Sequence, residues 1–208
     1  MKILELFSGT ESFSKVARER GHETFTIDNN PDFNPDLCKN ILDLVLDDIP
    51  WFPDIIWASP PCTFFSVASI GKHWNIDNTP KTPQAELGVK IVNKTIGIIK
   101  MLNPKCVVIE NPRGKLRKLD LIDYKRESVC YCKYGDTRMK PTDLWNNIGF
   151  VGKMCKNGNP CHVSAPRGSK TGTQGLKGNM ERSVIPRDLC LEIIKLCEVK
   201  NEKTETFK

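Results

Sequence analysis

Short apolar runs alternate with amphipathic stretches along the first half of the chain. Residues 2–7, 53–59 and 106–111 are nearly continuous in hydrophobic side chains, whereas residues 23–28 alternate between apolar and polar positions. Continuous runs are typical of parallel strands that are buried on both faces, and alternation is typical of a half-buried strand. The pattern therefore predicts four strands within the first 111 residues.

Amphipathic stretches between these strands predict two helices. One covers residues 11–20, where apolar side chains recur at helical spacing, and it ends at Gly21. The other covers residues 83–102, with Thr82 as its N-cap and Pro83 in its first turn. Alternating strands and helices predict an α/β fold with a doubly wound, mostly parallel sheet and helices on both faces.

The second half of the chain is less regular. It predicts a short helix at residues 115–122, a strand at 127–135, a strand or turn at 141–147 and a final helix at 186–199, with an aperiodic, glycine-rich stretch at 152–181. We therefore expect a main domain formed by residues 1–145 and 182–200, a short glycine-rich insert at 146–181 and a flexible tail at 201–208.

The composition, with 39% hydrophobic and 27% charged residues, is that of a globular protein and excludes a disordered or fibrous chain. No apolar stretch reaches the roughly 18 residues that a membrane helix needs, and the first residues lack the features of a signal peptide. We therefore expect a cytoplasmic protein without a membrane partner. The net charge of +6 fits an anionic partner, and basic residues outnumber acidic ones in residues 113–140 and 153–177.

Four predicted strands end on residues that can take part in binding or chemistry: Gly9, Asp28, Cys62 and Glu110. Ligands of open α/β sheets bind beyond the carboxyl ends of the strands. Pro60 and Pro61 lift the chain off the sheet just before Cys62, and Glu110 ends the next strand. A thiol beside a carboxyl group can act as a nucleophile beside an acid or base.

Four segments, taken in order, resemble the motifs of the DNA cytosine-5 methyltransferase family, in particular its compact bacteriophage members. They are LFSGTESFSKVARERGH (residues 6–22), TID (26–28), SPPCTFFS (59–66) and VIENP (108–112). Their order and spacing make the match specific, although each motif alone would be weak. The resemblance implies a Rossmann-like methyltransferase domain that uses S-adenosyl-L-methionine and acts on double-stranded DNA, as a monomer in the cytoplasm of a bacterial host.

The resemblance assigns methyl transfer to four residues. Cys62 is expected to add as a thiolate to carbon 6 of a cytosine that is flipped out of the duplex, and Glu110 to contact ring nitrogen 3 and the exocyclic amine. YGDTRMKPTDLW (residues 134–145) resembles, more loosely, a strand whose cations hold the target base and its phosphate, which would give Arg138 and Lys140 that role. A solvated basic hairpin is the alternative. Asn111 is expected to fix the catalytic loop rather than to touch the substrate.

The resemblance also implies the residues that bind the cofactor and the DNA. The cofactor positions are Phe7, Ser8, Gly9, Thr10, Glu11 and Ser12 in the first motif, Asp28 and Asn29 at the ribose, Asn40 and Ile41 near the adenine, Pro60, and Ser183 and Val184 in the GNMERSVIP segment. The expected DNA contacts are Ser66, Arg113, Arg167, Lys170 and Lys177. The last three lie in a basic loop whose cations and amides can follow phosphates, or which is simply flexible.

The chain departs from the family pattern in the first motif. Thr10, Glu11 and Ser12 follow Gly9 where the family commonly has further glycines, and Asn40 stands in place of an aspartate. Glycines at such turns let the backbone approach a ligand closely. Two alternatives therefore stay open: a catalytically degenerate DNA-binding protein, and the same chemistry on RNA or a free nucleotide.

Nine cysteines in a chain without a secretory signal are expected to be thiols rather than disulfides. Five residues could supply the four ligands of a tetrahedral zinc ion: Cys130, Cys132, Cys155, Cys161 and His162. Alternatively, Cys130 and Cys132 are core positions that share one face of a strand. His73 and Trp74 either help to close a lid over the flipped base or pack beside the catalytic loop.

Overall fold

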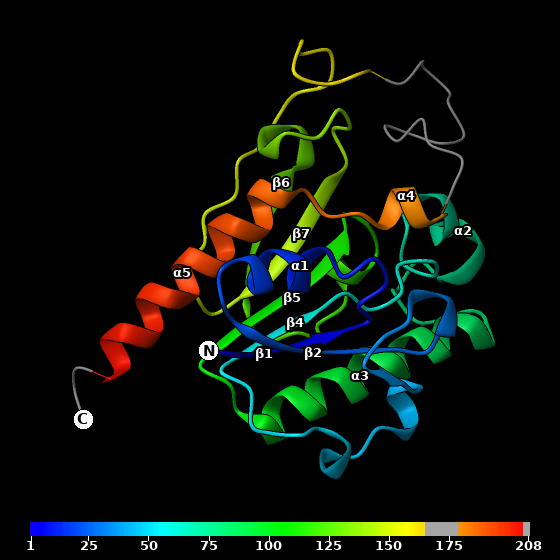
Figure 1. The fold of residues 1–208 in the computed structure, drawn as a ribbon. Helices are drawn as coiled ribbons and strands as arrows, with labels where there is room; N and C mark the ends of the chain where they lie inside the picture. The colour runs from blue at the N-terminus through cyan, green and yellow to red at the C-terminus, as the bar shows by residue number, and fades with distance from the viewer. Residues whose placement is uncertain (165–178, 206–208) are drawn as a thin grey trace.

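The computed structural model describes residues 1–164 and 179–205, which form a central sheet with helices on both sides (Figure 1). The strands are β1 (Lys2–Leu6), β2 (Glu23–Asp28), β3 (Leu37–Cys38), β4 (Ile55–Ala58), β5 (Cys106–Pro112), β6 (Lys125–Cys130) and β7 (Pro141–Asn146). The α-helices are α1 (Ser12–Glu19), α2 (Ile70–His73), α3 (Pro83–Leu102), α4 (Asn179–Ser183) and α5 (Arg187–Glu205). Short 3-10 helices are η1 (Pro31–Phe33), η2 (Ile41–Asp43), η3 (Leu46–Asp48), η4 (Val67–Ser69), η5 (Leu116–Lys118) and η6 (Tyr131–Tyr134).

The sheet has the strand order β3-β2-β1-β4-β5-β7-β6. The strands from β3 to β5 pair in parallel, and β7 pairs in antiparallel fashion with both β5 and β6. The order reverses at β1, because β2 lies on one side of it and β4 on the other. This confirms the predicted α/β fold with a mostly parallel, doubly wound sheet, and it brings the carboxyl ends of β1, β2, β4 and β5 to one edge.

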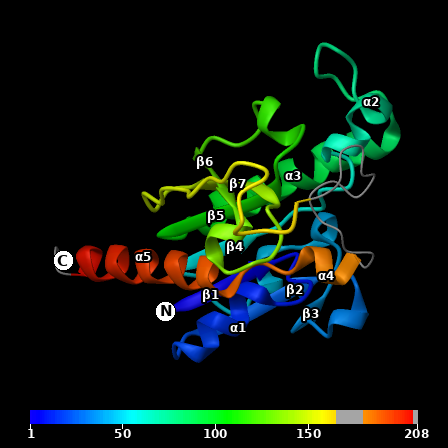
Figure 2. The same ribbon diagram turned by 90° about the horizontal axis from the view of Figure 1, so that it is seen from above.

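Helices cover both faces of the sheet, and Figure 2 shows the three layers from above, with α1 and α5 on one side and α3 on the other. Alternation along each strand fills both layers. In β1, Ile3 packs in the core cluster that contains Phe13 of α1 and Ile193 of α5, whereas Leu4 packs in the cluster that contains Ile96 of α3. Parallel strands that are buried on both faces of the sheet account for the continuous apolar runs in the sequence.

The two helices predicted in the first half are confirmed. The long helix α3 begins at Pro83, and the hydroxyl of Thr82 accepts a hydrogen bond from the backbone N–H of Ala85 at 3.3 Å, as expected of an N-cap. Asn103 ends α3 in the left-handed conformation, with φ 45°. These signals are local, so the sequence was sufficient to locate them.

The structure corrects several predictions for the second half. The strand predicted at residues 127–135 ends at Cys130, where the buried side chain of Tyr131 begins the turn η6, and Gly135 closes that turn at φ 85°. The short helix predicted at 115–122 is the single 3-10 turn η5. The final helix α5 runs through Glu205 and so takes in most of the predicted tail, because Lys105 of the neighbouring β5 connection holds the side chain of Asn201.

The predicted insert contains little regular structure where it is described. Residues 151–164 form no helix or strand, and α4 crosses the predicted boundary between residues 181 and 182. The predicted DNA contacts Arg167, Lys170 and Lys177 lie outside the described residues. Within residues 1–164 and 179–205, no helix combines the length and the apolar character that crossing a membrane requires.

Candidate active site

The loop that carries Cys62 leaves β4 and is fixed to the end of β5. The buried side chain of Asn111 donates a hydrogen bond from Nδ2 to the carbonyl oxygen of Pro60, at 2.8 Å. The backbone amides of Phe65 and Ser66 both donate to the carbonyl oxygen of Cys62, at 3.0 and 2.9 Å. Asn111 thus fixes the loop, as expected from the sequence, and the thiol lies half-buried between β4 and β5.

A close approach between two backbones holds the far side of this loop. A Cβ atom added at Gly114 would lie 2.2 Å from the carbonyl oxygen of Phe65, which already accepts a hydrogen bond from the amide of Lys115 at 2.6 Å. Only glycine fits here, because any side chain would push the two segments apart. Ser66, a predicted DNA contact, pairs with Gly114 in an isolated bridge, and the side chain of Arg113, another predicted contact, is exposed beside it.

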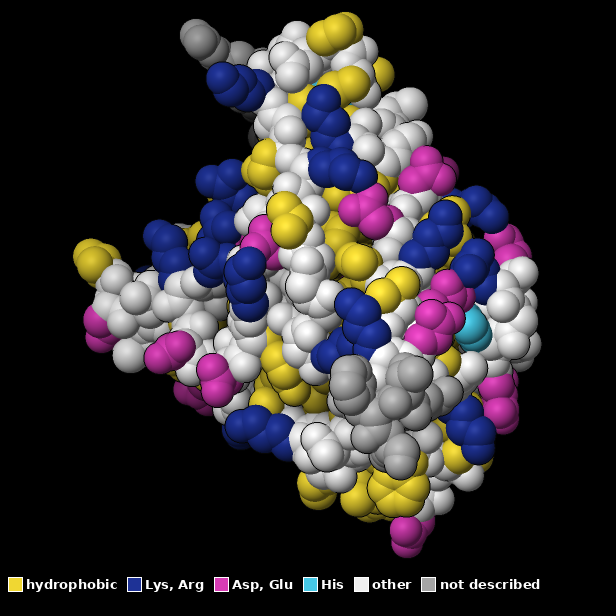
Figure 3. Space-filling model, turned by 90° about the vertical axis from the view of Figure 1, so that its left-hand side faces the viewer, with side chains coloured by type: hydrophobic (Ala, Val, Ile, Leu, Met, Phe, Trp, Pro, Cys, Tyr) yellow, Lys and Arg dark blue, Asp and Glu magenta, His cyan; other side chains and the backbone are white. Residues whose placement is uncertain are grey.

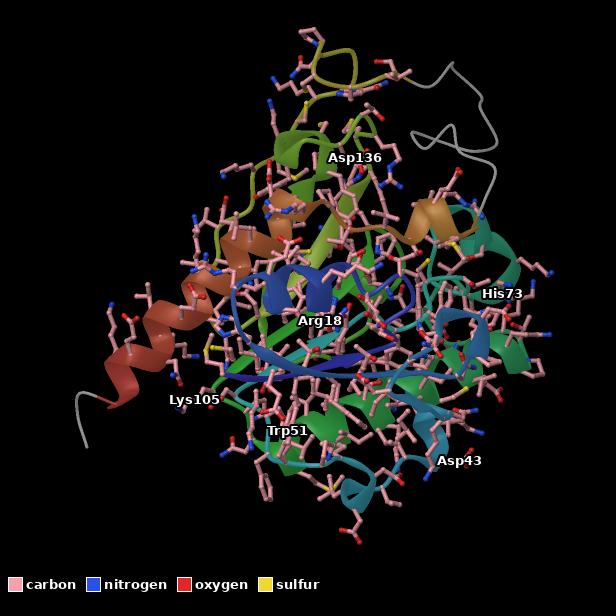
Figure 4. All side chains as sticks on the ribbon, viewed as in Figure 1. Arg18, Asp43, Trp51, His73, Lys105 and Asp136 are labelled. Atoms are coloured by element: carbon pink, nitrogen blue, oxygen red, sulfur yellow. The ribbon has the colours of Figure 1, made fainter. Side chains whose placement is uncertain are left out.

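His73 and Trp74 pack beside the catalytic loop. Both side chains are buried, and the indole of Trp74 donates to the carbonyl oxygen of Phe64 at 2.7 Å. His73 is the last residue of α2 (Figure 4), with Nδ1 2.7 Å from the hydroxyl oxygen of Thr82. Of the two roles open for this pair, the structure supports packing.

Glu110 lies at the end of β5 with its carboxyl group in a buried, polar environment. Its exposed fraction is 6%, and the hydroxyl of Tyr131 donates to Oε1 at 3.0 Å. Burial raises the pKa of Glu110 above its ordinary value, whereas the charge of Lys140 and the hydrogen bond from Tyr131 lower it. The net shift is upward, so this carboxyl group keeps its proton to a higher pH than an exposed glutamate does.

Cys62, Glu110 and Lys140 share one electrostatic environment. Burial raises the pKa of the Cys62 thiol, and the negative charge of Glu110 raises it further, whereas the positive charges of Lys140 and Arg182 lower it. Burial lowers the pKa of Lys140, and the charge of Glu110 opposes that shift. The structure therefore brings together the three residues that the sequence placed on β4, β5 and the 134–145 segment.

Arg138 and Lys140 are buried, so the predicted alternative of a solvated basic hairpin is wrong. Arg138 forms an ion pair with Asp136 and donates to the carbonyl oxygens of Glu181 and Val184, at 3.0 and 3.1 Å. Lys140 donates to the carbonyl oxygen of Arg182 at 2.8 Å, and its Nζ atom lies 4.5 Å from the centre of the Tyr131 ring. These two cations hold the C-terminal end of α4 beside Cys62.

Sequence reasoning missed Tyr131 and Asp136. Tyr131 is fully buried, with its ring beneath Lys140 and its hydroxyl on Glu110. Asp136 follows η6 near the upper end of the molecule in Figure 4, where its carboxylate neutralises Arg138. A tyrosine between two cysteines gives no sign that its hydroxyl will reach Glu110. The spacing of Asp136 and Arg138, by contrast, is typical of a local ion pair.

The turn after β1 has an unusual backbone. Phe7, Gly9 and Glu11 all take left-handed conformations, with φ 59°, 46° and 54°. Glycine adopts this conformation without cost, whereas another residue loses roughly 1 kcal/mol. Glu11, one of the residues that stand where the family has glycines, therefore keeps a backbone suited to glycine, and its carboxylate pairs with Arg18.

Asp28 joins this turn to the end of β2. One carboxylate oxygen accepts a hydrogen bond from the amide of Gly9 and the other from the amide of Asn30, both at 2.9 Å. Behind the turn, Glu5 is buried in β1 and accepts a hydrogen bond from the amide of Ser14 at 2.8 Å, which anchors the first turn of α1. Burial raises the pKa of Glu5 to about 7.

The remaining predicted cofactor positions lie around the same turn. The hydroxyl of Ser12 accepts a hydrogen bond from the amide of Ile185 at 3.1 Å, which brings the segment of Ser183 and Val184 beside the end of β1. Asn40 is exposed and caps η2, with Oδ1 accepting from the amide of Leu42 at 3.0 Å. The other positions are Ser8 and Thr10 in the turn, exposed Asn29 after Asp28, and buried Ile41 in η2.

Comparisons with known proteins identify similar sequences and folds. A relative from Frog virus 3 (isolate Goorha), named as a probable DNA (cytosine-5)-methyltransferase, is 32% identical over 219 residues, which cover 95% of this chain and 100% of the relative. Two solved structures are similar in fold at low identity. A protein of an E. coli prophage, described as a DNA modification methyltransferase, has a TM-score of 0.51 at 15% identity, over 70% of this chain and 46% of its own. The Entamoeba histolytica methyltransferase EhMeth has a TM-score of 0.53 at 16% identity, over 74% of this chain and 56% of its own.

The chain spans about half the length of these two solved structures, and their low identity supports the fold alone. The family model for C-5 cytosine-specific DNA methylase matches residues 1–120, which include the turn after β1, the Cys62 loop and the end of β5. The match to the viral relative extends over 95% of the chain. The chain therefore belongs to the C-5 cytosine-specific DNA methylase family.

Proposed function

We propose that this protein transfers a methyl group from S-adenosyl-L-methionine to carbon 5 of cytosine in double-stranded DNA, through a covalent adduct of Cys62. The observation that carries the proposal is the grouping of Cys62, Glu110 and Lys140 near the ends of β4 and β5, where the charges of Glu110 and Lys140 both act on the pKa of Cys62 and on each other. The predictions of a bacteriophage origin, a bacterial cytoplasm and a monomeric state stay predictions.

Cys62 acts as the nucleophile. Its thiolate forms an Sγ–C6 bond, and the electron pair of the ring double bond moves toward carbon 5 and ring nitrogen 3. Glu110, whose raised pKa favours the protonated carboxyl group, donates a hydrogen bond or proton at nitrogen 3. Carbon 5 then takes the methyl group, whose bond to the sulfonium sulfur breaks so that the cofactor would leave as the neutral thioether. The proton on carbon 5 is lost to water, the Sγ–C6 bond breaks to release the Cys62 thiolate, and nitrogen 3 returns its proton to Glu110 as the aromatic ring is restored.

Lys140 has two effects in this scheme. Its positive charge lowers the pKa of Cys62 and so favours the thiolate, and the same charge also limits the upward shift at Glu110. A neutral carboxyl group at Glu110 favours the thiolate, because a negative charge there raises the pKa of Cys62.

The residues around β1 and β2 fit the cofactor, which would supply an electrophilic methyl group. The hydroxyl oxygen of Ser8 is buried and has no hydrogen-bond partner among the described residues, so it can serve a ligand. A Cβ atom added at Gly9 would meet nothing within 4 Å, so the space above this turn is open. Asp28 accepts one hydrogen bond at each carboxylate oxygen and keeps acceptor capacity for ribose hydroxyls.

The target cytosine must leave the duplex to reach Cys62, because stacked neighbours cover carbon 6, and extrusion costs a few kcal/mol. Exposed Arg113 and partly buried Ser66 lie on the loop edge beside Cys62, where they can contact the DNA strand next to the extruded base. The cations Arg138 and Lys140 are engaged by backbone carbonyl oxygens. We propose that DNA exchanges some of these contacts for the target base and its phosphate.

Incubation with tritiated S-adenosyl-L-methionine and duplex DNA, followed by nucleoside analysis, tests this function. We expect label at carbon 5 of cytosine with the parent protein and none with Cys62→Ser. Cys38→Ser is the matched control, because Cys38 is exposed on β3 at the far edge of the sheet and should not alter labelling. Equal labelling by the Cys62 variant would exclude the adduct mechanism. Labelling of RNA but not of DNA would exclude double-stranded DNA as the substrate.

Glu110→Gln separates chemistry from cofactor binding. We expect it to lower the methylation rate about 10²–10⁴-fold, the range typical of a missing acid or base. The affinity for S-adenosyl-L-methionine, measured by calorimetry, should stay close to that of the parent protein because Asp28 and the β1 turn are unchanged. A large loss of cofactor affinity would show that Glu110 belongs to the cofactor site instead.

A further inference from the structure

Four potential metal ligands converge at the base of the 151–164 segment. Cys132 comes from η6, and Cys155, Cys161 and His162 come from the segment itself. Their ligand atoms all lie within 4.8 Å of one another. Of the five candidates that the sequence offered for four positions, Cys130 is the one outside this group, and its thiol lies 3.8 Å from the carbonyl oxygen of Cys155.

Two of the distances within the cluster match a tetrahedral zinc site, and a third is slightly shorter. A zinc ion with Zn–S bonds of about 2.3 Å and a Zn–N bond of about 2.0 Å sets its ligand atoms about 3.5–3.8 Å apart. Nδ1 of His162 lies 3.8 Å from Sγ of Cys155 and 3.6 Å from Sγ of Cys161. The two sulfur atoms are 3.3 Å apart, which is far longer than the roughly 2.05 Å of a disulfide bond.

Neighbouring side chains orient the ligands. Nε2 of His162 lies 3.5 Å from the Oδ1 atom of Asn157, which favours the tautomer with a proton on Nε2 and a free lone pair on Nδ1. The side-chain amide of Asn159 donates a hydrogen bond from Nδ2 to Sγ of Cys155 at 3.4 Å, as expected for a sulfur that carries negative charge. Cys132, Cys155 and His162 are each 8% exposed, so three of the four ligands are shielded from water.

The 151–164 segment lacks other means to order itself. It contains no helix or strand, and the side chains of Val151 and Val163 are exposed by 67% and 74%. Hydrophobic side chains accordingly reach the surface at the upper end of the molecule in Figure 3. The small core beneath it consists of three cysteines with Met139 packed against them. A segment with so little apolar burial usually needs a covalent or metal link.

We infer that Cys132, Cys155, Cys161 and His162 form a structural zinc site that fastens the 151–164 segment to η6. Four protein ligands complete the coordination sphere and leave no position for a substrate, so the ion is structural and not catalytic. The site joins the segment to the turn that carries Tyr131, the hydrogen-bond donor to Glu110. Zinc thus ties the segment to the wall of the candidate active site.

Metal analysis of the purified protein tests the inference. After expression with added zinc and dialysis in chelator-free buffer, we expect inductively coupled plasma mass spectrometry to find about one zinc ion per chain. Replacement of the zinc by Co²⁺ should give thiolate charge-transfer and tetrahedral d–d absorption bands. A parent protein that holds far less than one equivalent of zinc, or that carries a Cys155–Cys161 disulfide in its place, would overturn the inference.

Variants assign the ligands. Cys161→Ser and His162→Asn should each lose the bound zinc, whereas Cys38→Ser should keep it. Asn157→Ala retains all four ligands and should weaken zinc binding about 10–100-fold through loss of His162 orientation. Full zinc retention by both ligand variants would overturn the assignment. Because zinc content is measured without DNA or S-adenosyl-L-methionine, this result is independent of the outcome of the methylation experiment.

Discussion

The pKa of the Cys62 thiol is raised chiefly by burial, and its charged neighbours adjust it further. Glu110 and burial favour the thiol, whereas Lys140 and Arg182 favour the thiolate. Lys140 is itself buried and reaches this position from an unusual backbone, with φ 26°. A cation beside a thiol favours the reactive thiolate, and strained backbone conformations cluster at functional sites.

Alkylation of Cys62 by iodoacetamide, followed by peptide mass spectrometry across a pH series, measures this balance directly. Glu110→Gln removes a negative charge, so we expect the pH midpoint of alkylation to fall. Lys140→Met removes a positive charge and should raise the midpoint. Exposed Cys38, followed in the same digests, is the internal control and should react equally in all three proteins. Unchanged midpoints in both variants would contradict the electrostatic coupling.

At the scale of elements, the Cys62 loop is held by contacts from three directions. Asn111 holds its start, Gly114 permits contact with its end, and Trp74 covers its middle. Phe65 is fully buried beneath the loop, and its ring would lie 3.2 Å from a Cβ atom at Gly88 of α3. The position of the thiol is therefore set by packing on β5 and α3 and not by the loop sequence alone.

Gly114→Ala tests this dependence. The added methyl group would sit 2.2 Å from the carbonyl oxygen of Phe65, so the loop must move. A shift of about 1 Å in a reacting group can cost roughly 10²-fold in rate, and we expect a loss of that order in single-turnover methylation. Cofactor affinity should change little, because the β1 turn is not displaced.

The matched control is Gly97→Ala, in the middle of α3, where an added Cβ atom meets nothing within 4 Å. This variant should keep the methylation rate and gain up to about 1 kcal/mol of stability from better helix propensity. If Gly114→Ala methylates as fast as Gly97→Ala, the loop tolerates the displacement and the close approach has no catalytic role.

Local signals in the sequence predicted the first half of the fold and much of the site. The apolar runs gave β1, β4 and β5, and Thr82 gave the start of α3, because each signal acts within a few residues. Contacts over long separations were not predictable. Arg138 reaches Val184 across 46 positions, and Tyr131 reaches Glu110 across 21. Neither pair has a periodic pattern that links its members.

The position of Cys132, one of the proposed zinc ligands, could not be predicted from local sequence signals either. Alternation predicted that one strand would carry both Cys130 and Cys132, but the strand ends at Cys130 and η6 turns Cys132 toward the 151–164 segment. What decides the end of the strand is the burial of Tyr131 against α5 residues such as Leu189, which is a tertiary effect. Local propensity could not reveal it.

At the scale of the whole molecule, Glu5 couples folding to pH. This carboxyl group lies in the middle of β1 between the sheet and α1, is 1% exposed, and has a pKa raised by burial from 4.5 to about 7. A raised pKa in the folded state means that the native protein binds a proton more tightly than the unfolded chain. The stability that this proton contributes is complete below about pH 4.5 and is lost as the pH rises through 7.

Glu5→Gln should therefore stabilise the protein at alkaline pH. The rise of this pKa from 4.5 to about 7 corresponds to about 3 kcal/mol. We therefore expect the free energy of unfolding of the variant to exceed that of the parent by about that amount at pH 8 and by little at pH 4.5. Urea unfolding across this pH range measures the difference. Glu86→Gln, which removes an exposed carboxylate from α3, is the control. A parallel pH dependence of parent and Glu5→Gln would contradict the assignment.

The surface charge is arranged in separate groups and not as one continuous basic face. On the side shown in Figure 3, Lys and Arg side chains form several patches with Asp and Glu among them. Several of these cations are already paired, such as Lys153 with Glu192 and Arg187 with Glu19. Attraction to DNA is therefore expected to depend on specific contacts near the site more than on the net charge of +6.

The described residues on either side of positions 165–178 are held by the same short turn, residues 137–140. The amide of Val163 donates to the carbonyl oxygen of Thr137 on the way out, and Arg138 and Lys140 hold the carbonyl oxygens of Val184 and Arg182 on the way back. The residues before and after positions 165–178 are thus fixed to neighbouring residues of one turn, Thr137, Arg138 and Lys140. A segment of different length or origin could therefore be placed between residues 164 and 179 while the sheet, the Cys62 loop and the turn after β1 keep their structure.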